Sequence, residues 1–195
     1  MTMEEIVHGE SKNVEFKETL PDKSEKYMKT IIAFANTQGG QLIVGVNDVT
    51  REVTGVDMDS VFKIMDRITN AVSDSCTPQI VPDITFQTIE GKTIVVVYVA
   101  PGANRPYYMK SRGKEGGTYI RVAGTSRQAD ADKIKELELE GARISWDELI
   151  CVGYEVKENA IKKLCRDMNR YRNEMQQRKG NAEKLQQVTR AQLLN

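Results

Sequence analysis

The sequence predicts an α+β fold with a mixed or antiparallel sheet, helices packed against it and a helical C-terminal extension. Residues 28–48 contain a helical apolar pattern, a glycine turn and an apolar strand in immediate succession. Residues 83–89 and 92–99 have the composition of two strands, and the two residues between them, Glu90-Gly91, are typical of a tight hairpin. Beyond Gly141 the pattern changes to that of helices.

The first helix is expected to end at Asn36. It begins at residues 22–25, where an aspartate or serine cap is followed by a glutamate. Glycines at 39–40 allow the chain to reverse, because glycine adopts positive φ without a Cβ penalty. Residues 42–46 form a nearly unbroken apolar run, which is typical of a strand covered on both faces. The residues that form the helical apolar stripe are Met28, Ile31, Ile32 and Ala35.

Shorter elements flank this segment. Val14 and Phe16 alternate with charged residues, which predicts a short strand, whereas the chain before it is expected to be a flexible lead. Residues 51–56 are expected to pair with the buried strand as a hairpin. Helical spacing of apolar residues over 61–72 predicts a second helix, capped by the aspartate at 57 or 59.

The second half begins with the predicted hairpin and continues less regularly. Residues 101–117 are expected to be rich in loops, and residues 118–122 are expected to form a short strand. Residues 124–126 are predicted to cap a helix that carries Ile134 and Leu137.

The main domain is placed at residues 8–140. Residues 141–195 are expected to be a helical extension or linker, truncated inside a longer chain, with helices at 145–149 and 156–175.

Composition excludes several classes of protein. The net charge is zero, from 28 basic and 28 acidic residues, which argues against a uniformly basic nucleic-acid coat. No apolar run approaches the ~20 residues needed to span a membrane, and the N-terminus lacks a signal-like segment, so a cytoplasmic protein is expected. Three cysteines without CxxC spacing suggest neither a disulfide framework nor a zinc site.

His8 is the only histidine in the sequence. It is therefore the one candidate for a mechanism that uses a histidine as a metal ligand or as a general base.

Charge is nevertheless uneven along the chain. Residues 104–128 carry six cations against one anion, together with several tyrosines. Cations that neutralise phosphates and aromatic rings that stack on bases are typical of nucleic-acid contacts. Ordinary loops are also often charged, and Arg121 in a strand could equally form an internal ion pair. The candidate nucleic-acid-binding residues are Arg105, Tyr107, Lys110, Arg112, Lys114, Arg121 and Arg127.

Several motifs together resemble the Schlafen AlbA-type (AlbA_2) domain family. The likeness covers residues 8–140 and includes Glu10-Ser11, VEFK at 14–17, AFANTQGG at 33–40, LIVGVND at 42–48, Gly55, Arg105-Pro106-Tyr107 and Tyr119-Ile120-Arg121. Bacterial chains of this kind are usually larger, with a further helical and winged-helix part, and are commonly described as transcriptional regulators. The resemblance therefore implies a DNA- or RNA-binding module of such a regulator.

The resemblance also implies an alternative chemistry. Related domains of animal Schlafen proteins cleave RNA with acidic residues, and the matching positions here are Glu10, Glu15 and Asp48. Three converging carboxylates could hold Mg²⁺ or Mn²⁺ for a metal-dependent endoribonuclease. Alternatively, Glu15 pairs with Lys17 or Arg121, Asp48 makes an Asx turn and Glu10 is solvated. Binding is favoured over catalysis, because the RNA-cleaving examples use two such domains and this chain has one.

Binding alone requires no cofactor. The sequence contains no GxxxxGK[ST] motif, so ATP binding through a Walker loop is not expected. A third hypothesis is an oligomerisation module, in which the amphipathic helix at 156–175 pairs with a second copy of the chain.

Overall fold

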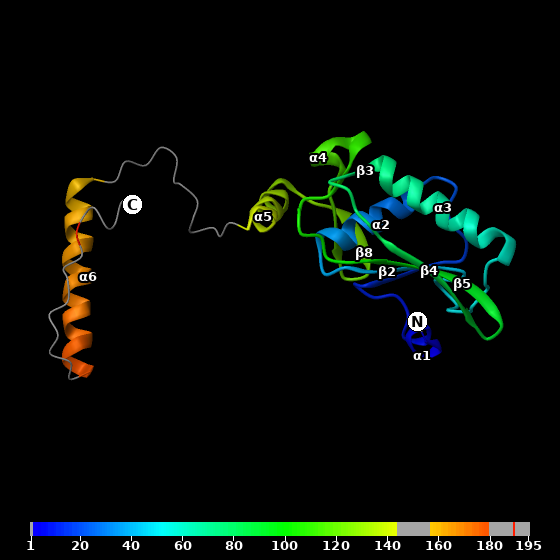
Figure 1. Cartoon of the computed structure of the whole chain (residues 1–195), viewed down its shortest axis with the longest axis horizontal. Coiled ribbons are helices and arrows are strands. Elements are labelled where there is room, and N and C mark those ends of the chain that lie inside the picture. Colours follow the sequence, from blue (N-terminus) through cyan, green and yellow to red (C-terminus); the bar gives the residue numbers. More distant parts are fainter. Residues whose placement is uncertain (1, 144–156, 180–188, 190–195) are drawn as a thin grey trace. The chain divides into compact units, whose positions relative to one another are not determined.

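The computed structural model describes residues 2–143, 157–179 and 189. The chain divides into two compact units, residues 1–148 and 149–195, which are described separately. The first unit combines helices with a mixed sheet and smaller antiparallel pairs, so the predicted α+β fold is confirmed (Figure 1).

A four-stranded sheet forms the centre of the first unit, in the order β1-β2-β5-β4. The first two strands are parallel, with Phe16 opposite Ile43, and the other neighbours are antiparallel. The sheet is therefore mixed, which was one of the two predicted alternatives, the other being antiparallel. Its strands are β1 (Val14–Lys17), β2 (Gly40–Val44), β4 (Asp83–Ile89) and β5 (Lys92–Val99).

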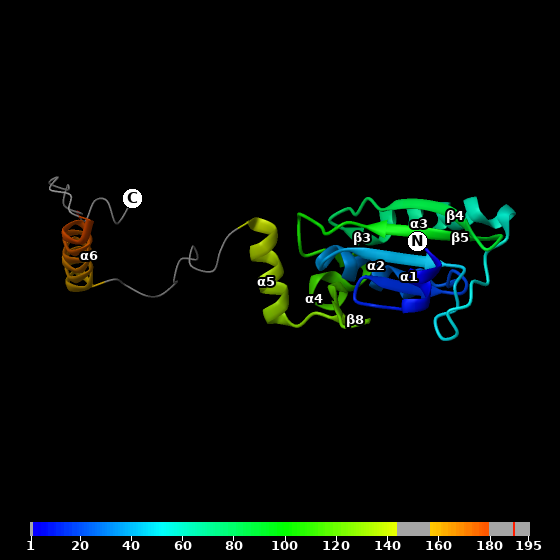
Figure 2. The ribbon, with the colours of Figure 1, turned by 90° about the horizontal axis from the view of Figure 1, so that it is seen from below.

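Helices cover both faces of this sheet (Figures 1 and 2). On one face, α2 (Glu25–Asn36) and α3 (Met58–Ser75) pack on the larger apolar cluster. On the other, α1 (Met3–His8) buries Ile6 in a second cluster with Phe16 and Ile43. The expected flexible lead is therefore wrong: a capping box between Thr2 and Glu5 starts a helix that Ile6 anchors.

The helix starts differ in detail from the prediction. Helix α2 begins after Ser24, whose φ of −56° and ψ of −31° are helical and whose side chain makes no capping bond. The Asp22 carboxylate lies 3.7 Å from Arg67 instead. Asp57 precedes α3, also without a side-chain cap. After α2 the chain reverses at Gly39, whose φ is 76°, as predicted.

The hairpin of β4 and β5 is confirmed, with Ile89 opposite Lys92. Glu90 and Gly91 have φ of 50° and 76°, the double left-handed geometry that matches the twist of paired strands. The expected hairpin at 51–56 is reduced to one bridge, Val46 to Val53.

Short elements fill the second half of the unit. The predicted cap at 124–126 is wrong: these residues belong to a tight turn and to strand β8, which pairs with β7. Asp130 caps the following helix instead, its carboxylate accepting a 2.8 Å hydrogen bond from the Lys133 N–H. The elements are β3 (Cys76–Thr77), β6 (Tyr108–Met109), η1 (Lys110–Arg112), α4 (Gly113–Gly117), β7 (Tyr119–Val122), β8 (Thr125–Gln128) and α5 (Ala131–Ala142).

In the second unit the structure describes one long helix, α6 (Glu158–Lys179). This confirms the helix predicted at 156–175, although the observed helix starts two residues later and ends four residues later. The helix predicted at 145–149 lies outside the described residues. Among the helices that the structure describes, none is long and apolar enough to cross a membrane.

Candidate nucleic-acid interface

Arg121 of β7 is a buried anchor between distant segments. Its side chain is 2% exposed, and its Nη1 lies 2.9 Å from the Glu15 carboxylate. Its Nη2 and Nε donate to the main-chain carbonyls of Ser11 and Lys12, at 2.9 and 3.2 Å. The guanidinium also lies over the Phe34 ring, 5.0 Å from its centroid. The internal ion pair, one of the two alternatives for Arg121, is therefore present.

Asn36 is a second anchor, at a position that was predicted as the end of the helix and as part of the AFANTQGG motif. Its Nδ2 donates to the carbonyls of Tyr107 and Tyr119, at 2.7 and 2.9 Å, and its Oδ1 accepts from the Tyr107 N–H at 2.7 Å. The residue is buried, so these bonds satisfy polar groups that water does not reach. The signals for this role were a polar residue at the end of an apolar helical stripe and its place in that motif.

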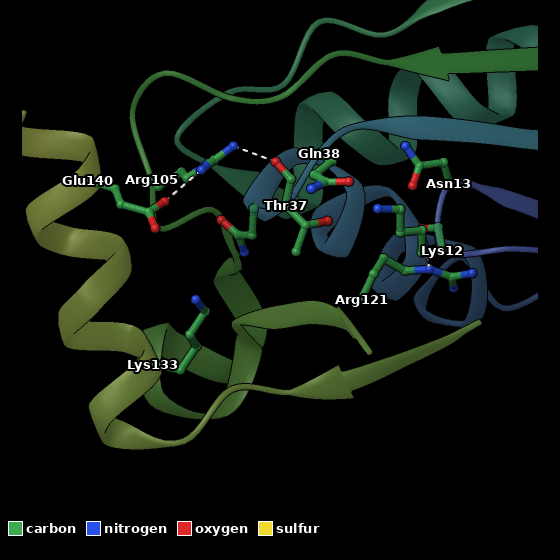
Figure 3. Close-up of a pocket in the computed structure, with 9 residues that line it drawn as sticks. Lys12, Asn13, Thr37, Gln38, Arg105, Arg121, Lys133 and Glu140 are labelled. Atoms are coloured by element: carbon green, nitrogen blue, oxygen red, sulfur yellow. Dashed lines mark hydrogen bonds and ion pairs between the residues drawn. The ribbon is translucent and has the colours of Figure 1, made fainter. Parts of the chain in front are cut away.

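A polar pocket of about 340 Å³ lies between these anchors and α5 (Figure 3). Lys133 and Glu140 come from α5, and Lys12 lies across the pocket from them. Lys133 Nζ also contacts Glu136 at 2.8 Å, whereas Lys12 has no ion pair among the residues that the structure describes. The lining thus contains four cations and one carboxylate; its residues are Lys12, Asn13, Asn36, Thr37, Gln38, Arg105, Arg121, Lys133 and Glu140.

Residues 10–130, which include most of this pocket, match the model of the family described as Schlafen, AlbA_2. The chain belongs to the Schlafen AlbA_2 family. The resemblance inferred from the motifs is thereby confirmed over more than half of the chain.

Two solved structures are similar to this chain, and the first of them shares its fold. The DIP2311 protein of Corynebacterium diphtheriae is 22% identical with a TM-score of 0.50, over 80% of this chain and 33% of that one. The N-terminal domain of a RecG-related protein from Nitrosomonas europaea is 26% identical with a TM-score of 0.48, over 65% of this chain and 90% of that one. This chain thus matches about a third of the length of the diphtheria protein.

In the AlbA_2 domain, the basic stretch at 104–128 is largely neutralised by acids distant in sequence. Arg105 Nη1 lies 2.6 Å from the Glu140 carboxylate, and Arg105 Nε donates to the Ala35 carbonyl. Arg112 pairs with Glu25 of α2. Lys114 pairs with Glu138 at 2.6 Å. Lys110 differs, because its Nζ donates to the uncharged Ser73 carbonyl at 3.2 Å.

Arg127 and Tyr107 complete the set of predicted binding residues. Arg127 is exposed on β8, and Nε lies 3.4 Å from the Thr125 hydroxyl. Tyr107 is 6% exposed and belongs to the larger apolar cluster, so its ring is not presented at the surface for stacking. The structure therefore places the seven residues in different roles and gathers two of them, Arg105 and Arg121, at the pocket.

The ion pairs on the surface shift the pKa values of their partners. A hydrogen bond from Lys114 lowers the pKa of Glu138, and the same bond raises the pKa of Lys114. A hydrogen bond from Lys29 lowers the pKa of Glu25, with Arg112 adding to the effect. These carboxylates remain charged to a lower pH than an isolated glutamate.

The three predicted catalytic carboxylates are in separate environments. Both oxygens of Glu15 are occupied by cations: Oε1 lies 2.8 Å from Lys17 Nζ, and Oε2 lies 2.9 Å from Arg121. Glu10 Oε1 accepts a 2.9 Å hydrogen bond from the Phe16 N–H. Asp48 is exposed, and the turn beside it is made by Asn47, whose Oδ1 accepts from two main-chain N–H groups.

As arranged, these side chains do not fit a divalent metal. Within residues 2–143, 157–179 and 189, no three His, Cys, Asp or Glu side chains are grouped so that they could hold one. The endoribonuclease hypothesis for Glu10, Glu15 and Asp48 stays a prediction, and we derive no metal-dependent step from this geometry.

Proposed function

We propose that this AlbA_2 domain binds the phosphate backbone of DNA or RNA at the polar pocket, as a cytoplasmic nucleic-acid-binding module of a transcriptional regulator. The observation that supports the proposal is the lining of the pocket, where segments far apart in sequence bring four cations to one place. Glu140 is the carboxylate on that lining, and Glu15 and Glu136 pair with Arg121 and Lys133 from outside it. Concentrated positive charge of this kind favours phosphate contacts and attracts polyanions.

The two arginines and the two lysines contribute differently. Arg121 donates four hydrogen bonds from its guanidinium, which has five N–H groups. The acceptors belong to Ser11, Lys12, Glu15 and Ser126. Arg105 is bonded through each of its three nitrogens, to the Ala35 carbonyl, Glu140 and the Thr37 carbonyl. These arginines therefore position the walls of the pocket and add fixed charge.

Contact with phosphate is assigned to Lys12 and Lys133. Lys12 is exposed and unpaired among the described residues, and the Lys133 pair with Glu136 lies on one helix face, where such pairs stabilise weakly. A phosphate oxygen can displace this partner at little cost. The amides of Asn13 and Gln38 on the same lining can donate further hydrogen bonds to phosphate or sugar.

The proposal is tested by fluorescence anisotropy of labelled single-stranded RNA, single-stranded DNA and duplex DNA over a range of salt concentrations. Binding should weaken steeply with salt, because counterions are released from each contacted phosphate. Lys12→Ala and Lys133→Ala should each weaken binding uniformly across sequences and reduce the salt slope by roughly one unit.

Lys63→Ala is the matched control. Lys63 is an exposed lysine of α3 that does not line the pocket, so its removal changes the net charge equally without touching the proposed site. Failure of the unmodified protein to bind at low salt would contradict the proposal, as would equal losses for Lys63→Ala and Lys12→Ala. Arg121→Ala is less informative, because it also removes a buried ion pair.

A further inference from the structure

Helix α6 carries a heptad pattern that the proposed function does not use. Five apolar residues follow one another at spacings of three, four, three and four, which is the a and d pattern of a coiled coil. Ile161 at the start of the stripe is buried, at 8% exposed, whereas Leu164, Met168 and Tyr171 are 51%, 37% and 63% exposed, so the middle of the stripe is uncovered within the described residues. In order, the stripe consists of Ile161 (a), Leu164 (d), Met168 (a), Tyr171 (d) and Met175 (a).

The charges that flank this stripe distinguish between the two ways of pairing it. With Ile161 at a, Asp167 occupies g and Arg172 occupies e of the next heptad. In a parallel pair, g of one helix lies beside e of the next heptad of the other helix, so Asp167 meets Arg172 of the second copy on both sides. In an antiparallel pair, g lies beside g and e beside e. That arrangement would place acids at 167 and 174 together.

We propose that α6 pairs with α6 of a second copy of this chain as a parallel, in-register, two-stranded coiled coil. Apolar contact along the stripe supplies the association, and the Asp167–Arg172 pairs set the orientation. Within each helix, Arg170 lies 3.3 Å from Asp167 and 4.0 Å from Glu174, which stabilises the helix but leaves the Asp167 carboxylate at the flank of the stripe.

The pairing is expected to be weak and dependent on concentration. Only about two heptads carry the pattern, and short helices gain most of their stability from packing against a partner. The proposal concerns association alone and stands or falls independently of nucleic-acid binding.

The first test is sedimentation equilibrium of the full chain over a range of protein concentrations. The mass should rise towards twice the 22.0 kDa of one chain. Asp167→Arg should raise the dissociation constant by about tenfold, because two arginines then face each other at each flank. Adding Arg172→Glu restores the opposite charges and should return most of the affinity, with the helix content checked by circular dichroism. A mass of one chain at every concentration would overturn the proposal and indicate that the stripe is covered by the chain itself.

Disulfide cross-linking tests the orientation. Leu164→Cys, made together with Cys151→Ser and Cys165→Ser, should form a cross-linked dimer on mild oxidation, because equivalent d positions face each other in a parallel pair. Cys76 can be retained, since it is buried and burial raises the pKa of its thiol to about 12. Arg166→Cys, on the outer face, is the control and should not cross-link. Equal cross-linking of both variants, or none for Leu164→Cys, would overturn the parallel arrangement.

Discussion

Asn36 and Arg121 are the two polar side chains on which the walls of the pocket depend. Asn36 ties the end of α2 to Tyr107 and to β7, and Arg121 ties β7 to Glu15 and to the chain before β1. Each satisfies several buried groups at once, so removing either leaves partners without hydrogen bonds. The pocket therefore rests on a few side chains that do not themselves have to touch a ligand.

Asn36→Ala should lower the free energy of unfolding by about 3 kcal/mol, because the variant leaves the buried Tyr107 N–H and two carbonyls unpaired. Urea denaturation followed by circular dichroism measures the change. Asn70→Ala, at an exposed position of α3, is the control and should change stability by less than about 0.5 kcal/mol. A similar small effect for Asn36→Ala would show that these bonds do not hold the pocket.

Asp48→Ala tests the predicted catalytic role of Asp48 in a variant that should keep its stability. Asp48 is exposed, so its loss should change the free energy of unfolding by less than about 0.5 kcal/mol. If the endoribonuclease prediction holds, Mn²⁺-dependent cleavage of RNA followed by gel electrophoresis should be abolished in this variant. RNA that stays intact with the unmodified protein at high concentration would show the prediction to be wrong.

At the scale of elements, the β4–β5 hairpin and the tie between α4 and α5 can be tested by stability alone. Gly91 has a φ of 76°, and a Cβ there would meet no atom within 4 Å. Its substitution therefore reports the cost of backbone conformation without a clash. The Lys114–Glu138 pair, by contrast, joins two helices through charge at the surface.

Gly91→Ala should destabilise the protein by about 1 kcal/mol, because an L-residue is forced into the left-handed region. Thermal unfolding measures the shift. Gly124→Ala is the matched control, since it also adds a Cβ in open space but at a turn glycine without positive φ. Equal effects of the two substitutions would mean that the hairpin geometry at Gly91 is not the cause.

The Lys114–Glu138 pair should make a small contribution that depends on pH. The pKa of Glu138 is lowered in the folded protein, so the stabilisation is present above the unfolded value near 4.5 and is lost as the pH falls through the lower folded value. Both side chains are partly exposed, and we expect less than about 1 kcal/mol. Comparing urea denaturation of the unmodified protein and Glu138→Gln at several pH values tests this; a difference that persists at the lowest pH would contradict it.

At the scale of the whole molecule, the two proposals together predict avidity. A dimer formed through α6 would carry two AlbA_2 pockets, and linked sites bind a long nucleic acid more tightly than one site does. Leu164→Arg should therefore lower the apparent affinity for a long nucleic acid by at least about tenfold. Affinity for an oligonucleotide that fills one pocket should be unchanged; equal losses on both ligands would contradict the link.

The sequence by itself determined the elements whose signal is local. The apolar stripe of α2, the β4–β5 turn at Glu90-Gly91 and the amphipathic pattern of α6 each lie within short segments of the sequence, and each predicted its element. The family motifs likewise identified the AlbA_2 domain. A turn followed by a short strand at 124–128 was mistaken for a helix cap, because small polar residues suit both.

Only the tertiary structure decided which charges are free. Residues 104–128 are strongly basic in sequence. In the structure, however, Arg121 pairs with Glu15, 106 residues away in the chain, and Arg112 pairs with Glu25, 87 residues away. Such pairs depend on how strands and helices pack, which no local pattern encodes. The same packing brings Lys12 and Lys133, two lysines outside that stretch, to the pocket, because the segment before β1 and helix α5 both line it beside the end of α2.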